Sequence, residues 1–290
     1  IGTGYVGLVT GAGLSDFGNQ VICTDINEDK INELLSGEIP IYEPGLKELV
    51  DRNVSAGRLI FSTDIPPALK KSEVVIIAVW TPMGKNGGAD LSAVKSVAKM
   101  IGENLNGYKV ICTKSTVPIG TGKIIRKIIE KISGDSQEFD VVSNPEFLRE
   151  GSAVKDFLIP NRIVIGSESE RAQKVMKQVY RPLFINETPI VITDVLSAET
   201  IKYASNAFLA VKISYINELA NLCDATGADV HLVARGMGLD GRISSKFLHP
   251  GPGFGGSCFP KDTSALVHMA KKENVEMKIV NAAITSNSIQ

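Results

Sequence analysis

Short apolar runs rich in β-branched residues alternate with amphipathic stretches over the first two thirds of the chain. The strand-like runs are Gln20–Thr24, Arg58–Ser62, Val74–Val79, Lys109–Thr113, Asp140–Ser143, Arg162–Gly166 and Ile190–Thr193. Helical patterns lie between them, for example at Asp90–Leu105 and Gly120–Ile132. Strands that alternate with helices predict an α/β fold with a doubly wound parallel sheet covered on both faces.

The pattern changes near Ser197, where a helix can begin that no Pro or Gly interrupts until Gly227. Such a helix is roughly 45 Å long at 1.5 Å per residue. Its apolar positions recur at helical spacing, at Ile201, Ala204, Phe208, Val211 and Tyr215. A helix this long can pass from one domain into another or form a subunit interface, and a core helix within one domain is the alternative. Further helical patterns at 229–236 and 263–272 predict two domains, 1–195 and a helical one over 196–290.

Composition describes an ordinary globular protein. The 290 residues are 43% hydrophobic and 22% charged, with a formal net charge of -1, so no basic surface for nucleic acid is indicated. The apolar runs are far shorter than the roughly 20 residues of a membrane span, and no signal peptide is visible, so we expect a cytoplasmic protein. Four cysteines form no CxxC pair, and three histidines lack metal-ligand spacing. Structural cysteines therefore fit better than disulfides or a metal site.

A glycine motif opens the chain. Gly2-Thr3-Gly4-Tyr5-Val6-Gly7 matches GxGxxG, whose glycines allow a tight turn, close approach of a diphosphate, and packing of a helix on a strand. A helical pattern, a strand and then Asp25 follow, and an acidic residue at this distance binds the adenosine ribose. The charge of Asp25 would repel a 2′-phosphate, so a Rossmann-like site for NAD is favoured over NADP. Lys30 can approach the cofactor or be a solvated helix lysine.

Both ends of the sequence look cut. A dinucleotide-binding unit needs a strand before its glycine motif, yet the chain starts at Ile1, without Met, and only the last strand residue precedes the motif. The final residues, Ile284–Gln290, lie within or just after a helical pattern without a clear stop. We therefore expect the chain to be part of a longer polypeptide.

Polar segments follow three of the predicted strands, where open α/β sheets bind their ligands. The first contains Thr81, and the second contains Ser115 and Thr116, whose hydroxyls suit phosphate or nicotinamide contacts, although helix capping is an alternative. The third, Asn144–Gly151, carries two carboxylates and an arginine and reads as an active-site loop more readily than as a surface turn.

Two further groups can carry chemistry. Lys202 and Asn206 stand four residues apart on one helix face, where a cation and an amide could stabilise an oxyanion, unless they are a solvated pair. Near the end, Cys258 lies in a glycine-rich segment with Lys261 and Asp262 shortly after it. A nearby cation favours a nucleophilic thiolate, whereas a buried thiol in a tight turn is the alternative.

Together these segments resemble the UDP-glucose dehydrogenase family, within the wider UDP-glucose/GDP-mannose dehydrogenase group, over essentially the whole chain. The resemblance rests on Gly2–Gly7, Gly37–Leu46, Ser115–Pro118, Asn144–Gly151, Lys202 with Asn206, and Phe254–Asp262. The stretch Ile39–Leu46 is more similar to the UDP-glucose enzymes than to those acting on GDP-mannose.

The resemblance implies oxidation of UDP-glucose to UDP-glucuronate by two NAD⁺, with Cys258 as nucleophile through a thiohemiacetal and a thioester. The same chemistry on GDP-mannose or a UDP-N-acetyl-hexosamine is the near alternative. A non-catalytic NAD-binding scaffold and a two-electron hydroxyacid dehydrogenase are further hypotheses. The family also implies a homodimer through the central helices and a C-terminal UDP-binding domain, without which the fragment should be weak or inactive.

By the same resemblance, Lys202 and Asn206 stabilise the oxyanions, Asp262 moves protons with Lys202, Glu146 acts in thioester hydrolysis, and Thr116 positions the water. The implied cofactor contacts are Gly2, Gly4, Tyr5, Val6, Gly7, Asp25, Lys30, Thr81, Ser115, Thr116, Glu150 and Lys261. The implied substrate contacts are Glu146, Phe147, Leu148, Arg149, Glu150, Lys202, Asn206, Phe247, Leu248, His249, Pro250, Gly251 and Gly255, with Arg242 reaching the substrate of the partner subunit.

Overall fold

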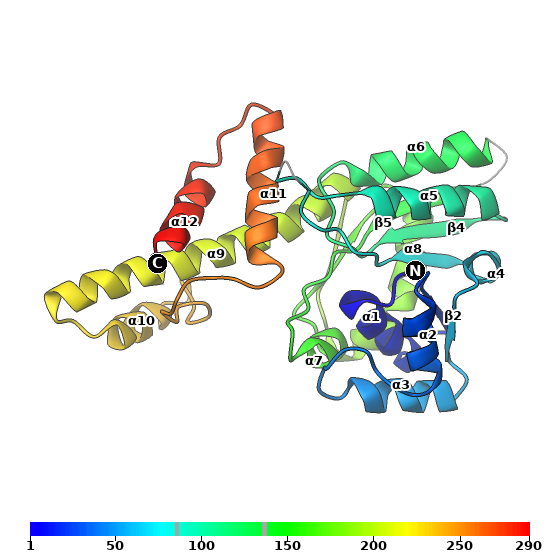
Figure 1. Cartoon of the computed structure of the whole chain (residues 1–290), viewed down its shortest axis with the longest axis horizontal. Helices are drawn as coiled ribbons and strands as arrows, with labels where there is room; N and C mark the ends of the chain where they lie inside the picture. The colour runs from blue at the N-terminus through cyan, green and yellow to red at the C-terminus, as the bar shows by residue number, and fades with distance from the viewer. Residues whose placement is uncertain (85–86, 135–137) are drawn as a thin grey trace. The chain divides into compact units, whose positions relative to one another are not determined.

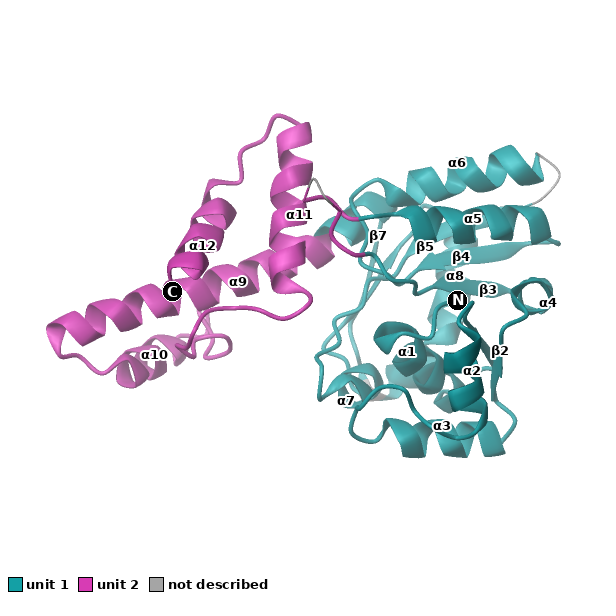
Figure 2. Cartoon of the chain, viewed as in Figure 1, with its two compact units in different colours: residues 1–81, 90–200 teal, residues 82–89, 201–290 magenta. Residues whose placement is uncertain are grey.

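The chain forms two compact units in a computed structural model that describes residues 1–84, 87–134 and 138–290 (Figure 2). Unit 1 comprises residues 1–81 and 90–200, and unit 2 comprises residues 82–89 and 201–290. The helix α9 (Val195–Thr226) contributes residues to both units. The domain boundary that we expect between residues 195 and 196 stays a prediction.

The strands of unit 1 form two sheets that the first residues of the chain connect. The sheet orders are β1-β2 and β3-β4-β5-β6-β7. The Ile1 nitrogen donates to the Ile76 carbonyl oxygen at 2.7 Å, and Gly2 N donates to Thr24 O at 2.7 Å. Ile1–Gly2 therefore lies between β1 and β3. The bounds are β1 (Val21–Thr24), β2 (Leu59–Ser62), β3 (Val74–Ile77), β4 (Lys109–Thr113), β5 (Phe139–Ser143), β6 (Ile163–Gly166) and β7 (Ile190–Thr193).

The expected parallel α/β sheet is confirmed, with one exception. The pairs β1–β2, β3–β4, β4–β5 and β6–β7 are parallel, but β5 and β6 pair in the antiparallel sense at Ser143 and Gly166. Side-chain alternation marks a segment as a strand but carries no information on its direction. The sequence pattern could therefore not distinguish this pairing from the parallel ones.

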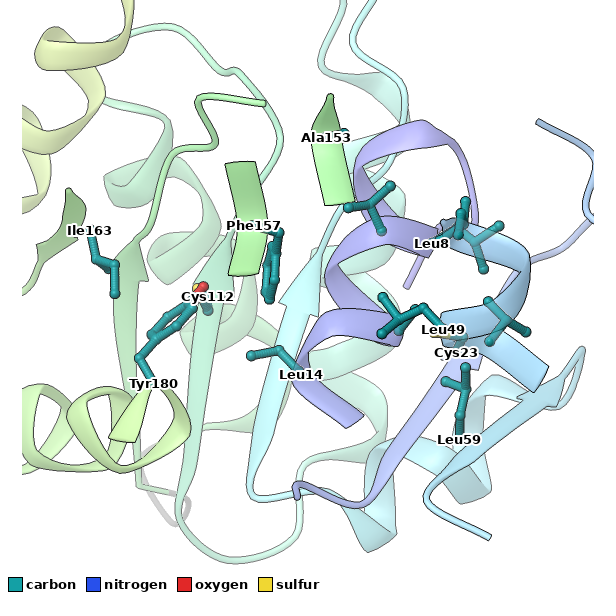
Figure 3. Close-up of a cluster of buried hydrophobic side chains, with 14 of the residues drawn as sticks. Leu8, Leu14, Cys23, Leu49, Leu59, Cys112, Ala153, Phe157, Ile163 and Tyr180 are labelled. Carbon is teal, nitrogen blue, oxygen red and sulfur yellow. The ribbon is translucent and has the colours of Figure 1, made fainter. Parts of the chain in front are cut away.

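Helices cover both faces of the larger sheet. The alternation along β4 divides its side chains, because Val110 and Cys112 join one hydrophobic cluster with α1, α3 and α7, whereas Ile111 joins another with α5 and α6 (Figures 1 and 3). Both clusters consist of buried residues, as a doubly wound fold requires. The helices are α1 (Tyr5–Asp16), α2 (Glu28–Leu35), α3 (Leu46–Ser55), α4 (Ile65–Lys71), α5 (Ser92–Asn104), α6 (Thr121–Ser133), α7 (Ala153–Leu158) and α8 (Glu170–Val179), followed by the 3₁₀ helix η1 (Arg181–Asn186).

Unit 2 is helical, with α9 joined by α10 (Val230–Gly238), α11 (Phe259–Lys272) and α12 (Lys278–Ile289). Tyr203 of α9 packs with Ala265 and Leu266 of α11 and Val280 of α12 in one cluster. Helix α11 begins at Phe259, before the expected start at Thr263, and Pro260 lies in its first turn, where a missing N–H costs nothing. The Lys261–Asp262 pair is therefore helical rather than part of a turn.

The apolar stripe that the sequence predicts on α9 lies largely outside the core, because Ala204, Phe208 and Tyr215 are exposed and Ile201 and Val211 are half-buried. Phe208, Tyr215 and Leu222, spaced seven residues apart, are 64%, 49% and 58% exposed, whereas Tyr203, Ala210 and Ile216 are fully buried. Of the three alternatives for this helix, a core helix within one domain fits least. Among the helices that the structure describes, none is long and apolar enough to cross a membrane.

Candidate active site

The three glycines of the GxGxxG motif have three different environments. Gly2 has a φ of 95°, and a Cβ there would lie 2.6 Å from the Ala78 carbonyl oxygen. A Cβ on Gly7 would lie 1.9 Å from the Gly2 carbonyl oxygen, so only glycine lets α1 pack on this turn. A Cβ on Gly4 would meet nothing within 4 Å. The backbone at Gly4 is open to a ligand at the N-terminus of α1, whose first turn contains no acidic residue, and it fits a cofactor diphosphate.

Asp25 holds the glycine loop at the end of β1. Its Oδ2 accepts hydrogen bonds from the Thr3 backbone nitrogen at 2.8 Å and from Thr3 Oγ1 at 2.9 Å. Although burial raises the pKa of the Asp25 carboxyl, hydrogen bonds from Thr3 and Asn27 outweigh this effect and hold the pKa below its usual value. Asp25 is therefore ionised at neutral pH. Lys30 Nζ lies 3.7 Å from Asp25 Oδ2, so Lys30 is paired with Asp25 rather than purely solvated, and its contact with a cofactor stays a prediction.

The hydroxyls at the ends of β3 and β4 connect these strands. Ser115 Oγ donates to the Val79 carbonyl oxygen at 2.7 Å, and Thr81 Oγ1 donates to the Thr116 carbonyl oxygen at 2.9 Å. The N-cap of α6 is Gly120, so these hydroxyls do not cap that helix. Ser115 and Thr81 are buried, and Thr116 is half-buried at the same edge. The expected gathering of hydroxyls beyond the two strand ends is present.

The loop after β5 is held by its own side chains. Glu146 is 7% exposed, and its Oε2 accepts from the Leu148 backbone nitrogen at 2.6 Å. Phe147 stacks under the Arg162 guanidinium, with 3.6 Å from its central carbon to the ring centroid. Arg149 pairs with Asp156 of α7 at 2.6 Å. The Arg149 side chain is therefore used to hold the loop, and Glu150 is exposed.

In unit 2 a buried carboxylate joins the two helices that carry the candidate groups. Asn206 Nδ2 of α9 donates to Asp262 Oδ2 at 2.6 Å, and Lys261 Nζ lies 2.5 Å from Asp262 Oδ1. Asp262 is 1% exposed. Lys202 and Asn206 are buried, at 4% and 8% exposure, so the solvated-pair alternative is wrong. Lys261, implied as a cofactor contact, is engaged here by its neighbour.

Cys258 differs from the other three cysteines in its exposure. Cys23, Cys112 and Cys223 are buried, whereas Cys258 is exposed at the N-cap of α11. Burial raises the pKa of Cys23 to about 11 and that of Cys112 to about 12, so both remain neutral thiols at pH 7. The alternative of a buried thiol in a tight turn is therefore wrong for Cys258. Its Sγ lies 3.6 Å from Ser257 Oγ.

The segment before Cys258 is fastened by two asparagines that sequence reasoning missed. Asn287 of α12 accepts from Phe254 N at 2.6 Å and donates to Phe254 O at 3.0 Å. Asn217 of α9 accepts from Gly251 N at 2.8 Å. Asn217 stands eleven residues after Asn206, which is about three helical turns, so the sequence could have placed both on the same face of the helix. No pattern in the sequence distinguishes Asn287.

Other expected substrate contacts lie within this segment or directly before it in the chain. Phe259 makes edge contacts with Phe247 and with Phe254, at 6.2 Å between ring centroids in both cases. Leu248 is buried, Pro250 is half-buried, and His249 and Gly255 are exposed. Arg242 is 90% exposed and pairs with Asp240 at 2.6 Å, so it is available on the surface of unit 2.

Taken together, unit 1 has the turn, helix N-terminus and acidic residue of a dinucleotide-binding α/β domain, and unit 2 is a helical unit with an accessible cysteine. Residues 1–184 match the NAD binding domain, and residues 196–289 the central domain, of the UDP-glucose/GDP-mannose dehydrogenase family. The chain belongs to this family.

Individual relatives agree with this assignment. The chain is 55% identical to UDP-glucose 6-dehydrogenase TuaD of Bacillus subtilis over 100% of its own length and 62% of that protein. It is 53% identical to UDP-glucose 6-dehydrogenase of Rhizobium meliloti, over 99% of the chain and 66% of the relative. A UDP-glucose dehydrogenase structure from Pyrobaculum islandicum matches with a TM-score of 0.96 at 40% identity, covering 99% of this chain and 67% of that one. The chain thus spans about two thirds of the length of these relatives.

Proposed function

We propose that the full-length protein is an NAD-dependent UDP-glucose 6-dehydrogenase that forms UDP-glucuronate. The observation that carries the proposal is the exposed Cys258 at the start of α11, in the same helical unit as the buried Asn206–Asp262–Lys261 cluster. An alcohol dehydrogenase needs no thiol, whereas oxidation to a carboxylate gains from a covalent adduct that retains the aldehyde. The names of the Bacillus subtilis and Rhizobium meliloti relatives point to the same substrate.

The proposed reaction has two oxidations and one hydrolysis. NAD, held at the glycine loop of residues 2–7 beside Asp25, would supply the acceptor for the hydride that the sugar C6 loses in each oxidation. The first oxidation gives an aldehyde, and Cys258 Sγ adds to its carbonyl carbon while the oxygen takes up a proton, forming a thiohemiacetal. The second oxidation gives a thioester. Water then attacks the thioester carbon, the C–S bond breaks, and the thiol and the carboxylate are released.

The other residues divide the charge and proton work in this scheme. Lys202 and Asn206 stabilise the oxyanions of the alkoxide, the thiohemiacetal and the hydrolytic intermediate. Asp262, which the Asn206 amide orients, relays protons with Lys202. Glu146 assists water in hydrolysis, and Thr116 positions that water. The Asn206 amide therefore has two roles in this scheme, to stabilise the oxyanion and to orient Asp262, to which its Nδ2 donates a hydrogen bond in the structure.

The nearest alternative is the same chemistry on another nucleotide sugar. A GDP-mannose dehydrogenase structure from Pseudomonas aeruginosa matches with a TM-score of 0.80 at 37% identity, covering 100% of this chain and 67% of that one. Its identity and TM-score are both lower than those of the UDP-glucose dehydrogenase structure. UDP-glucose is therefore the preferred substrate in this proposal.

The test is a substrate profile of the full-length protein, followed as NADH absorbance with UDP-glucose, GDP-mannose and a UDP-N-acetyl-hexosamine. We expect UDP-glucose to be oxidised with a kcat/KM at least about 100-fold above the others, since a site built to hydrogen-bond a substrate rejects analogues strongly. NADH formation from another sugar nucleotide but not from UDP-glucose would assign the chemistry to that sugar. No NADH from any of them would favour a non-catalytic NAD-binding scaffold.

We also propose a cytoplasmic homodimer assembled through α9. The exposed Phe208, Tyr215 and Leu222 form an apolar line along this helix, the arrangement that a helix–helix interface buries. Arg242, exposed on unit 2, would then reach the partner's substrate. Sedimentation of the full-length protein should give a dimer, and Tyr215→Glu should give a monomer. A Tyr215→Glu protein that stays dimeric would place the interface elsewhere.

A further inference from the structure

Glu43 is a buried carboxylate in the Gly37–Leu46 stretch, to which the proposed mechanism gives no part. It lies in the loop between α2 and α3 and is 5% exposed. Three groups donate hydrogen bonds to it. Its Oε2 accepts from the Tyr5 hydroxyl and from the Gly151 nitrogen at 2.9 Å, and its Oε1 accepts from the Ala153 nitrogen at 2.7 Å.

The donors belong to two loops with different tasks. Tyr5 is the first residue of α1 and follows Gly4 of the glycine loop directly. Gly151 ends the loop that carries Glu146, and Ala153 begins α7. The Tyr5 hydroxyl also lies 3.3 Å from the Arg149 carbonyl oxygen, so it touches the second loop itself. One carboxylate therefore fastens the glycine loop to the end of the 144–151 loop.

This arrangement is sensitive to the loss of a single group. The three donors named here are a phenol and two backbone amides, none of them a cation, so the buried carboxyl group of Glu43 depends on these hydrogen bonds. Gly151 has a φ of 81°, and its N–H is directed at Glu43 by that backbone conformation. Removing the carboxylate takes away the acceptor of all three donors, whereas removing the Tyr5 hydroxyl breaks the link between the two loops and leaves the bonds from Gly151 and Ala153 to Glu43 in place.

We propose that Glu43 is a positioning residue shared by the cofactor loop and the sugar-nucleotide loop, so that binding at one orders the other. The cofactor loop rests on the NAD-binding domain of the family, and the role of the 144–151 loop rests on the proposed function. A ligand that fixes one loop lowers the conformational cost that the second ligand must meet, so NAD and the nucleotide sugar bind with positive coupling.

The test uses the full-length protein with two informative variants and two matched controls. Tyr5→Phe removes one hydroxyl and leaves the ring, and Tyr42→Phe, at a side chain that is 91% exposed beside Glu43, is its control. Glu43→Gln keeps the size of the side chain but turns an NH₂ group toward N–H donors. Its control is Glu48→Gln, an exposed carboxylate in the first turn of α3.

Three readouts are measured: the Kd of NADH by fluorescence titration, the KM for UDP-glucose, and hydrogen exchange in the segment 149–155. Tyr5→Phe should raise both the NADH Kd and the sugar KM about 3- to 30-fold, with a smaller change in kcat, the range expected for one hydrogen bond. In the wild type, NADH should slow exchange at the 151 and 153 amides, and in Tyr5→Phe it should not. The double variant Tyr5→Phe/Glu43→Gln should bind NADH and UDP-glucose no more weakly than Glu43→Gln alone, because both substitutions remove the same link between the loops.

The outcomes separate this inference from the proposed function. If Tyr5→Phe alters NADH binding while the sugar KM and the exchange of 149–155 follow the wild type, the shared role is wrong. Wild-type values in all three readouts overturn it as well. If Glu43→Gln fails to fold, the three readouts on Tyr5→Phe alone decide whether Glu43 has the shared role. If the wild type makes no NADH from UDP-glucose, the proposed function fails, but the NADH titration and the exchange experiment still decide the role of Glu43.

Discussion

The glycine loop allows a prediction in which stability and cofactor binding separate. A Cβ at Gly7 would lie 1.9 Å from the Gly2 carbonyl oxygen, and one at Gly4 would meet nothing within 4 Å. Gly4 has a φ of -70°, which alanine adopts without strain. Gly7→Ala should therefore damage the fold, and Gly4→Ala should damage only the approach of the cofactor.

The magnitudes follow from these contacts. Relieving the Gly7→Ala clash should cost about 1–3 kcal/mol, as overpacking usually does, and should lower the Tm by about 2–10 °C for a unit of this size. Gly4→Ala should change stability by less than about 1 kcal/mol, in the stabilising direction. It should weaken NADH binding about 10- to 150-fold, the loss of one charge-assisted hydrogen bond of about 1.5–3 kcal/mol to the diphosphate.

The assay pairs thermal unfolding by circular dichroism with NADH fluorescence titration on the full-length variants. Wild-type NADH affinity in Gly4→Ala would show that the open position at α1 is not where the diphosphate binds. A fall in Tm for Gly4→Ala as large as that for Gly7→Ala would refute the division of roles between the two glycines.

Three further predictions concern single side chains. Asp25→Asn should lower the preference for NAD over NADP at least about 10-fold in Kd, because the ionised carboxylate that repels a 2′-phosphate is gone; an unchanged ratio would show that another group discriminates. Glu199 accepts from the backbone nitrogens of Gly120 at 2.6 Å and Gly122 at 2.8 Å, and burial raises the pKa of Glu199 to about 7 despite these bonds. The pKa of Glu199 in the folded chain lies above the unfolded value of 4.5, so the unfolded chain releases this proton at a lower pH than the folded chain does. The free energy of unfolding should therefore fall by up to roughly 3 kcal/mol as the pH rises from about 4.5 to about 7. Glu199→Gln should lack this part of the slope in denaturant titrations, and equal slopes would contradict the assignment. Asn287→Ala should lower kcat about 10-fold and speed alkylation of Cys258, because Phe254 loses two anchors; an unaltered alkylation rate would mean that the loop is held elsewhere.

Hydrophobic periodicity was sufficient to predict a helix or strand wherever one face of that element is buried. The strand expected at Lys109–Thr113 has these bounds in the structure, and its alternation places Val110 and Ile111 on opposite faces of the sheet. The glycines of the GxGxxG motif form the turn and the helix contact that their residue types predict, and Asp25 lies at the end of β1, where its contact with a ribose stays a prediction. At these positions the local residue preferences and the packing of the whole fold favour the same backbone conformation.

Other features depend on contacts that a linear pattern does not contain. The stripe through Phe208 and Tyr215 indicated a helix, but not that this face lies outside the core. The start of α11 was expected too late because the glycines before Cys258 and the proline after it resemble a loop, although proline is tolerated in a first helical turn. Glu43 meets Gly151 from 108 residues away in sequence, and no spacing rule predicts such a pair.

In the proposed reaction, Cys258 retains the aldehyde between two oxidations. The most direct test of this role is the amount of NADH formed per UDP-glucose consumed by the full-length protein, wild type against Cys258→Ala. Two NADH should form per UDP-glucose in the wild type, and Cys258→Ala should form essentially no NADH beyond the first oxidation. One NADH per sugar in the wild type, or two in Cys258→Ala, would contradict the proposed reaction.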